Sequence, residues 1–470
     1  MRDIFLLTFL VAILLLSLKR PFLLILTYCY VDIVAPQKLS FFLLNKLPLS
    51  LIVFGLAVVS WIVADSKKGA RIDHLQVVLL ILLVYCGIST STADFPIEAL
   101  EKWSWVWKAL LWSIFLPLAL RTRLRIESLA LVMVLSAATL AIAGGLKTAL
   151  GGSGYGSLQL LIDDNSGLFE GSIFSTVAIA IIPLTLWLAR YGTIFRTSPY
   201  VWSFAIALVF ACLLIPVGTQ ARTGLVCAGL LAMLGLRDSK RRMTYIGAIA
   251  AIGVVALPLL PAAFSSRMGT ITNFQGDESA STRVAVWGWT WKYALDHPMG
   301  GGFEAYRQNE LQVNRVIERH SGGQVTREIV PYTDRGRAYH NSYFEMLGEQ
   351  GFPGLIIWLY LQLTCLIRME KLRRRYRECA FEDAWIRPLA TALQAGHLVY
   401  LLGAMFVGIA FQPFIYMLIA LQIGLHVYVK RREEEARWRP ITVEVGGGVS
   451  GPPVEGELTA STPAGWGMLR

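Results

Sequence analysis

The sequence predicts an all-α polytopic membrane protein with about twelve transmembrane helices and one long helical loop on the periplasmic side. Of its 470 residues, 55% are hydrophobic and only 16% are charged, whereas soluble domains carry about 25% charged residues. The mean hydropathy is +0.54. Apolar runs close to the roughly 20 residues that cross a bilayer recur along the whole chain. Lipid, rather than water, is therefore the main solvent that this sequence requires.

Thirteen apolar runs are visible, and they occupy residues 4–18, 21–35, 47–64, 75–90, 104–120, 126–148, 171–189, 200–217, 222–236, 244–264, 342–367, 388–408 and 412–429. The first run lacks the small-residue cleavage site of a signal peptide, so we expect it to be retained as a helix. Only Lys19 and Arg20 separate it from the second run. These two runs form either one bent span or a hairpin, which gives twelve or thirteen spans in all.

Short basic loops set the orientation, because Lys and Arg remain on the cytoplasmic side of a membrane. The basic loops are Lys67-Lys68 with Arg71, Arg121 to Arg125, Arg190 to Arg196, Arg237 to Arg242, Arg368 to Arg387, and Lys430 to Arg432. Taken alternately, they leave the segments 36–46, 91–103, 149–170, 218–221 and 265–341 on the opposite face, so the long segment is periplasmic or extracellular. Topology thus accounts for the net charge of +11, and no nucleic-acid partner is expected.

These observations divide the chain into four parts. Residues 1–264 hold the first ten or so transmembrane helices, 265–341 form the periplasmic loop with the catalytic residues, 342–430 hold the last transmembrane helices, and 431–470 form a disordered cytoplasmic tail rich in Gly and Pro. The long loop has room for several helices. One is predicted from Ser281 to Asp296, because Ser and Thr can cap its start and Pro298 follows its end.

Several kinds of chemistry find no support in the sequence. It contains no Walker A loop, no His-Glu-x-x-His motif and no Cys/His pair with metal spacing. The six cysteines lie in apolar runs or in a basic loop, so no disulfide framework is implied. The first outward segment, 36–46, contains no acidic residue. We therefore expect neither a cofactor nor a metal.

Two arginines stand out because few acidic residues lie beside them in the sequence. Arg222 sits between two apolar runs at the outer surface, and Arg283 lies in the long loop. An arginine at the edge of the bilayer needs an anionic partner, and a planar guanidinium donates two parallel hydrogen bonds to phosphate oxygens. The two side chains are candidates for binding a lipid-borne diphosphate without Mg²⁺. Snorkelling or helix capping is the alternative interpretation.

His340 is the candidate general base. It lies in Ala338-Tyr339-His340-Asn341-Ser342-Tyr343, where the long loop returns to the membrane. A neutral imidazole has a pKa near 6.5 and accepts a proton at periplasmic pH. The alternative is a purely structural histidine.

Further side chains could support the site, namely Asn341, Asp163, Asn165, Arg267, Trp287 and Tyr306. Trp287, Trp289 and Trp291 are interpreted as an interfacial aromatic belt, with stacking on an acceptor sugar as the sharper alternative. Asp163, Asp164 and Asn165 either orient a ligand or His340, or are solvated loop residues. The glycines 300–302 serve either as a tight turn or as a helix stop.

Several motifs in a fixed order resemble the O-antigen ligase and polymerase superfamily. They are Arg222-Thr223-Gly224, Ser281-Thr282-Arg283, Trp287, His297-Pro298, Gly300-Gly301-Gly302, His340-Asn341-Ser342-Tyr343-Phe344-Glu345 and Glu349-Gln350-Gly351-Phe352-Pro353-Gly354. The resemblance is strongest over residues 205–360. The opening of the chain is also similar to O-antigen ligases and exosortase-associated O-glycosylation ligases.

The resemblance implies a metal-independent glycosyltransferase of the GT-C type in the bacterial inner (cytoplasmic) membrane, with its active site facing the periplasm. Its donor would be a glycan on undecaprenyl diphosphate, and its acceptor a sugar of lipid A-core. Arg222 and Arg283 would bind the diphosphate, and His340 would deprotonate the acceptor hydroxyl. A single displacement would invert the anomeric centre.

Other functions use similar residues. Within the superfamily, polymerases extend one lipid-linked repeat with another, and protein O-oligosaccharyltransferases glycosylate Ser or Thr. A transporter or flippase of the lipid-linked sugar belongs to a different class. It would need arginines for phosphate but no base at the outer mouth.

Overall fold

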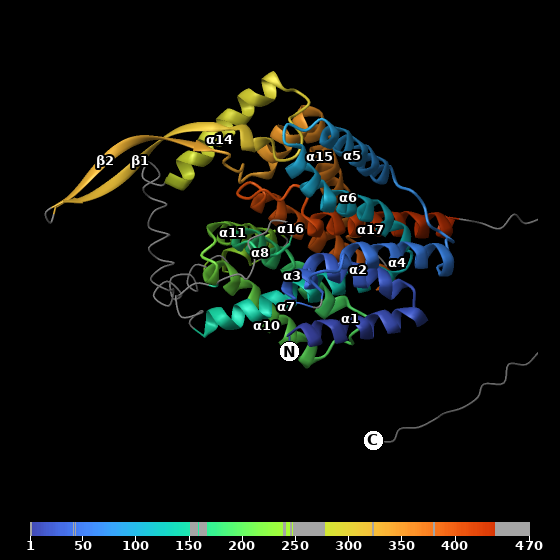
Figure 1. Ribbon diagram of the computed structural model, residues 1–470. Coiled ribbons are helices and arrows are strands. Elements are labelled where there is room, and N and C mark those ends of the chain that lie inside the picture. Colours follow the sequence, from blue (N-terminus) through green and yellow to red (C-terminus); the bar gives the residue numbers. More distant parts are fainter. Residues whose placement is uncertain are drawn as a thin grey trace, which may run out of the picture.

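The computed structural model describes residues 2–437, apart from 41, 43, 151–157, 159–166, 238–240, 245–246, 248–277, 322–323 and 379–380. The described helices are α1 (Arg2–Lys19), α2 (Phe22–Val34), α3 (Pro36–Leu39), α4 (Leu49–Ala64), α5 (His74–Ser91), α6 (Pro96–Ala119), α7 (Arg123–Ala149), α8 (Gly171–Ala180), α9 (Ile182–Tyr191), α10 (Pro199–Gly218), α11 (Arg222–Leu236), α14 (Glu278–Asp296), α15 (Ser342–Arg375), α16 (Ile386–Gly403) and α17 (Pro413–Arg437). Short 3₁₀ turns occupy Ala305–Gln308 (η4) and Phe381–Asp383 (η5), and two strands follow η4. Most of the helices pack around one hydrophobic core (Figure 1).

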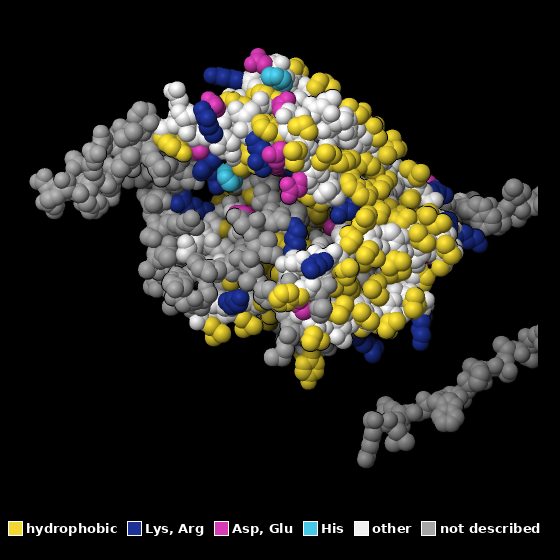
Figure 2. Space-filling view, viewed as in Figure 1, with side chains coloured by type: hydrophobic (Ala, Val, Ile, Leu, Met, Phe, Trp, Pro, Cys, Tyr) yellow, Lys and Arg dark blue, Asp and Glu magenta, His cyan; other side chains and the backbone are white. Residues whose placement is uncertain are grey.

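Apart from the run 244–264, which falls almost entirely outside the described residues, every predicted apolar run forms helix. Six of the helices in the described part are long and apolar enough to cross a membrane. Large hydrophobic side chains also remain on the outside of the bundle, among them Val59, Val84 and Phe210, and Figure 2 shows such side chains covering a broad area of one face. An apolar exterior is what a lipid-facing surface requires. The chain is a multi-pass helical membrane protein.

The first two apolar runs form a hairpin of two helices. The amide of Leu23 donates to the carbonyl of Arg20 at 2.9 Å in the tight turn between α1 and α2. Beyond the turn, the rings of Phe9 and Tyr30 meet edge to face with their centroids 5.3 Å apart. These rings lie about equally far from the turn, so the two helices run back along each other rather than forming one bent span.

The predicted basic loops meet at one end of the bundle, which we call the basic end. All six are joined by contacts of Asp65 with Arg121 and Arg125, Asp73 with Arg368, Arg123 with the carbonyl of Tyr191, Arg237 with Glu370, and Arg432 with Asp383. Because these loops alternate along the chain with the segments predicted to lie outside, the geometry agrees with the predicted alternation.

The opposite end, where residues 91–103, 218–221, 300–309 and 336–341 lie, is called the loop end. The amide of Asp94 donates to the carbonyl of Gly301 at 2.9 Å, which ties two of these segments together. In Figure 1 the strands β1 and β2 project beyond the bundle on the left, while α17 ends on the right.

The prediction of a long helical loop is correct only in part. The helix predicted over Ser281–Asp296 is confirmed as α14, but β1 (Glu310–Ser321) and β2 (Gln324–Arg335) form an antiparallel hairpin, paired from Glu310 with Arg335 to Ser321 with Gln324. The sequence of this region is rich in β-branched residues, and Gly322-Gly323 separates its two halves. Both features favour strands joined by a two-residue turn.

The last helix is longer than the sequence suggested. α17 continues to Arg437, although the predicted tail begins at residue 431. Residues 438–470, which make up the rest of that predicted tail, lie outside the described residues.

Candidate functional site

His340 lies directly before α15, in a backbone conformation fixed from both sides. Its φ is 46°, in the left-handed region. The next residue, Asn341, caps α15, because its Oδ1 accepts hydrogen bonds from the amides of Tyr343 at 2.9 Å and Phe344 at 3.3 Å. Its Nδ2 donates to the carbonyl of Met405 at 2.9 Å. Asn341 therefore holds the start of α15 against the segment that follows α16.

Trp287 braces the same segment from α14. Its Nε1 donates to the carbonyl of Tyr339 at 2.9 Å, and its ring stacks on Phe344 with the centroids 5.3 Å apart. Trp291, by contrast, is 51% exposed, as a residue of an aromatic belt would be. The contacts of Trp287 thus fix the backbone next to His340, a role that the sequence did not suggest.

The surroundings of His340 keep its imidazole neutral. Burial lowers the pKa of His340 below its ordinary value of 6.5, and the positive charges of Arg283 and Arg337 lower the pKa further. Arg283 comes from α14, so the packing of α14 on α15 brings together two of the three principal predicted site residues. A neutral imidazole is the form that accepts a proton.

Arg222, the third of these residues, is the first residue of α11 and is half-buried. Its helix runs antiparallel to α16, since Cys227 lies 3.5 Å from the carbonyl of Val399 while Arg237, directly after α11, contacts the earlier residue Gln394 at 3.4 Å. The start of α11 and the end of α16 therefore lie at the same end of the bundle. The chain leaves α16 towards Met405, which binds Asn341, so Arg222 belongs to the loop end together with His340.

The Gly300-Gly301-Gly302 motif holds α14 against α15. Gly300 and Gly302 have φ of 79° and 78°, and Gly351, where α15 kinks, has φ of 62°. A Cβ on Gly300 would lie 2.5 Å from the carbonyl oxygen of Glu349. The amide of Gly302 donates to that same carbonyl at 2.9 Å. Glycine is therefore required at these positions because the backbone after α14 approaches the backbone of α15 closely, and not only because a helix ends there.

The remaining predicted residues divide into two groups. Tyr306 packs edge to face on Tyr339 with the centroids 5.4 Å apart, and its pKa is raised by burial and then by Glu304, so Tyr306 keeps its proton. Asp163, Asp164, Asn165 and Arg267 lie outside the described residues.

A cluster of three buried charges was missed by the sequence analysis. The Nζ of Lys102 lies 2.7 Å from a carboxylate oxygen of Glu345 and 2.8 Å from one of Glu349. These side chains are 11%, 7% and 0% exposed. The amide of Ala410 donates to Glu345 at 3.1 Å, and that of Glu304 to Glu349 at 3.0 Å. The available signals were the lysine in an outward segment and the i, i+4 spacing of the two acids.

Two members of this cluster, Lys102 and Glu345, line an open cavity of about 640 Å³ at the loop end, which we call the charged cavity. Its lining includes Glu98, Glu101, Trp105, Glu304 and Arg307 as well as Lys102 and Glu345. Within the part of the chain that the structure describes, no group of three or more His, Cys, Asp or Glu side chains is arranged to hold a metal ion.

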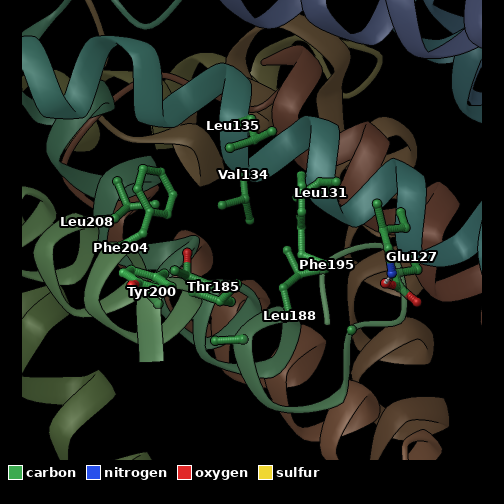
Figure 3. Close-up of a pocket in the computed structure, with 15 residues that line it drawn as sticks. Glu127, Leu131, Val134, Leu135, Thr185, Leu188, Phe195, Tyr200, Phe204 and Leu208 are labelled. Atoms are coloured by element: carbon green, nitrogen blue, oxygen red, sulfur yellow. Dashed lines mark hydrogen bonds between the residues drawn. The ribbon is translucent and has the colours of Figure 1, made fainter. Parts of the chain in front are cut away.

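A second cavity, of about 360 Å³, lies between α7, α9 and α10 near the basic end. Figure 3 shows its aliphatic and aromatic walls, with Glu127 at one edge. Glu127 is buried, and its carboxylate accepts hydrogen bonds from the amide and hydroxyl of Thr193 and from the amide of Ile194. We call this space the apolar cavity.

Two family models match the chain. A family of unknown function (DUF5935) matches residues 1–193, and a family described as O-Antigen ligase matches residues 207–359. A search of curated proteins found no match. The second model spans Arg222, Arg283 and His340, together with the helix α14 and the start of α15 that bring the last two together. Residues 207–359 are thus similar to the O-Antigen ligase family, which supports the predicted resemblance to the O-antigen ligase/polymerase superfamily.

Proposed function

We propose that this protein is an O-antigen ligase of the GT-C type. It transfers a glycan from undecaprenyl diphosphate to a sugar hydroxyl of lipid A-core at the periplasmic face of the inner membrane. The observation that carries this proposal is the juxtaposition of His340, whose surroundings favour a neutral imidazole, with the guanidinium of Arg283 at the loop end. The position of both residues in the matched O-Antigen ligase region supports it further.

In the proposed reaction, His340 takes the proton of the acceptor hydroxyl while the oxygen attacks the anomeric carbon of the donor. The bond from that carbon to the diphosphate oxygen breaks, and its electron pair leaves with undecaprenyl diphosphate. Arg222 and Arg283 stabilise the negative charge that grows on the leaving group. Because the displacement is a single step, the anomeric configuration inverts.

The positioning of the base also supports the proposal. A general base must lie within hydrogen-bond reach of the proton that it removes. Trp287 and Asn341 fix the backbone on either side of His340. The left-handed conformation of His340 costs free energy and persists only when neighbouring contacts impose it, as is frequent at functional sites.

The test is transfer by the purified protein in lipid nanodiscs, supplied with a lipid-linked glycan and with lipid A-core. We expect glycosylated lipid A-core, with the inverted anomeric configuration read by NMR. Extension of the lipid-linked glycan alone would indicate a polymerase. Transfer only onto peptide would indicate a protein O-oligosaccharyltransferase, and movement of the donor across the membrane without transfer would indicate a flippase. Each of these outcomes would overturn the ligase assignment.

A further inference from the structure

We propose that the charged cavity binds the saccharide part of the acceptor. This inference rests on the proposed function, because it identifies where the second substrate of that reaction is held. The volume of about 640 Å³ falls within the roughly 300–1,000 Å³ that is usual for small-molecule sites.

The lining of the cavity has the chemistry that a sugar needs. Carboxylates of Glu98, Glu101 and Glu304 accept hydrogen bonds from hydroxyl groups, and the guanidinium of Arg307 donates to hydroxyl oxygens. The indole of Trp105 offers an apolar surface to the C–H face of a sugar ring. Because a hydroxyl both donates and accepts, one neutral ligand satisfies both signs of charge.

Charge also separates this cavity from the donor site. Its acidic side chains, Glu98, Glu101, Glu304 and Glu345, slightly outnumber its cations, Lys38, Lys102 and Arg307. Lys102 is moreover already engaged by the buried carboxylates of Glu345 and Glu349. Because the acids slightly outnumber the cations, the cavity does not attract a negatively charged diphosphate. An uncharged, hydroxyl-rich saccharide is not repelled by these charges.

The cavity and the proposed donor residues lie on different elements. Its walls come from α3, α6, η4, the start of α15 and residues 408–412, whereas Arg222 and Arg283 stand on α11 and α14. The start of α15 joins the two regions. The hydroxyl of Ser342 accepts from the amide of Ile409, which lines the cavity, at 2.8 Å. His340 precedes Ser342 by two residues, so the backbone of the proposed base lies beside the wall of the cavity, as the meeting of an acceptor there with a donor held by the arginines would require.

The contact between Glu98 and Arg307, which both line the charged cavity, is weak. Glu98 is 35% exposed and lies 3.9 Å from Arg307, a separation too long for a strong hydrogen bond. Such a pair contributes little to stability. Glu98 can therefore turn to a ligand at small cost, unlike the buried cluster around Lys102. Arg307 also donates from Nε to a carboxylate oxygen of Glu304 at 3.2 Å, so it can contact a ligand through its other nitrogens.

The experiment measures binding without turnover. A delipidated core oligosaccharide is titrated calorimetrically into His340→Asn protein in nanodiscs, with and without Glu101→Gln or Trp105→Ala. We expect each cavity substitution to weaken binding about tenfold, the loss that corresponds to one good hydrogen bond or stacking contact. The affinity for undecaprenyl diphosphate should not change. Glu310→Gln is the matched control, because Glu310 is 60% exposed on the same side and pairs with Arg335 outside the cavity.

Unchanged oligosaccharide affinity in both cavity variants, or an equal loss of diphosphate affinity, would overturn the inference. Glu101 is exposed, so Glu101→Gln can be tested even if Trp105→Ala does not fold, and Trp105→Phe should keep most of the affinity. Failure of the proposed function gives a different result. The unaltered protein would then transfer nothing to lipid A-core, whereas failure of this inference alone leaves transfer intact with the acceptor KM unchanged in the cavity variants.

Discussion

The charged cavity and the apolar cavity both lie between helices, but their carboxylates are used differently. In the apolar cavity Glu127 is 1% exposed, and three donors from Thr193 and Ile194 satisfy it. In the charged cavity Glu98 and Glu101 face open space. A carboxylate satisfied by the protein's own donors holds the fold together, while one that faces a cavity remains available to a ligand.

Arginines at the two ends of the bundle act on different groups. At the basic end Arg125 and Arg368 make close ion pairs with Asp65 and Asp73. At the loop end Arg283 and Arg337 lower the pKa of His340. Placing cations beside a base disfavours its protonation, and such perturbed groups are typical of functional sites. Substitutions at the loop end should therefore affect the chemistry, and substitutions at the basic end should affect stability.

The largest effect is expected from removal of the base. His340→Ala should reduce transfer about 100- to 10,000-fold, because it removes the group that takes the acceptor proton in the proposed reaction. His340→Asn is the matched variant, since asparagine tolerates a left-handed backbone better than alanine does. Both proteins should still insert into the membrane and bind donor lipid. Full transfer by either variant, measured by product formation, would refute the role of His340.

Next in size is the loss of an arginine at the loop end. Arg283→Ala should weaken binding of undecaprenyl diphosphate about 10- to 150-fold, because a charge-assisted hydrogen bond contributes about 1.5–3 kcal/mol. Arg335→Ala is the control, because Arg335 is 73% exposed and pairs with Glu310. Donor affinity is measured by calorimetry, and an affinity equal to that of the control would contradict the phosphate role.

A change at the basic end should affect stability alone. Glu127→Ala removes the acceptor for two backbone amides and one hydroxyl, which should cost about 1–3 kcal/mol of unfolding free energy. Glu127→Gln should cost less, since its amide oxygen still accepts. Unfolding in denaturant gives the free energies. An altered KM for either substrate with unchanged stability would contradict the claim that Glu127 at the basic end acts on stability alone.

The smallest expected effect is on the pH profile. In the proposed reaction the neutral form of His340 is the active one, so transfer should fall as the pH drops through the pKa of His340, which lies below 6.5. Arg337→Gln removes one of the positive charges that lower this pKa, so the acidic limb of kcat/KM should move to higher pH. Arg337 is 44% exposed, and solvent screening keeps the movement small. A shift to lower pH would contradict the proposed electrostatics.

Much of the fold could be predicted because the relevant signals are local in the chain. Apolar runs gave the helices, and Ser281–Asp296 gave α14. The hairpin β1–β2 was not predicted, because its β-branched residues and the pair Gly322-Gly323 are weak local signals within a long polar loop. For the site, His340 and Arg283 were named in advance from motifs, and their proximity depends on how α14 packs on α15.

The sequence by itself determined that the chain lies in lipid and which loops share a side, because hydropathy, run length and basic charge can be read in one dimension. Tertiary structure decided that Trp287 holds the backbone of Tyr339 and that Lys102 lies between Glu345 and Glu349. It also decided that acids from α6, from the residue before η4 and from α15 surround one cavity. These contacts join residues up to 247 positions apart, and only the packing of helices brings such residues within the few ångströms over which hydrogen bonds and ion pairs act.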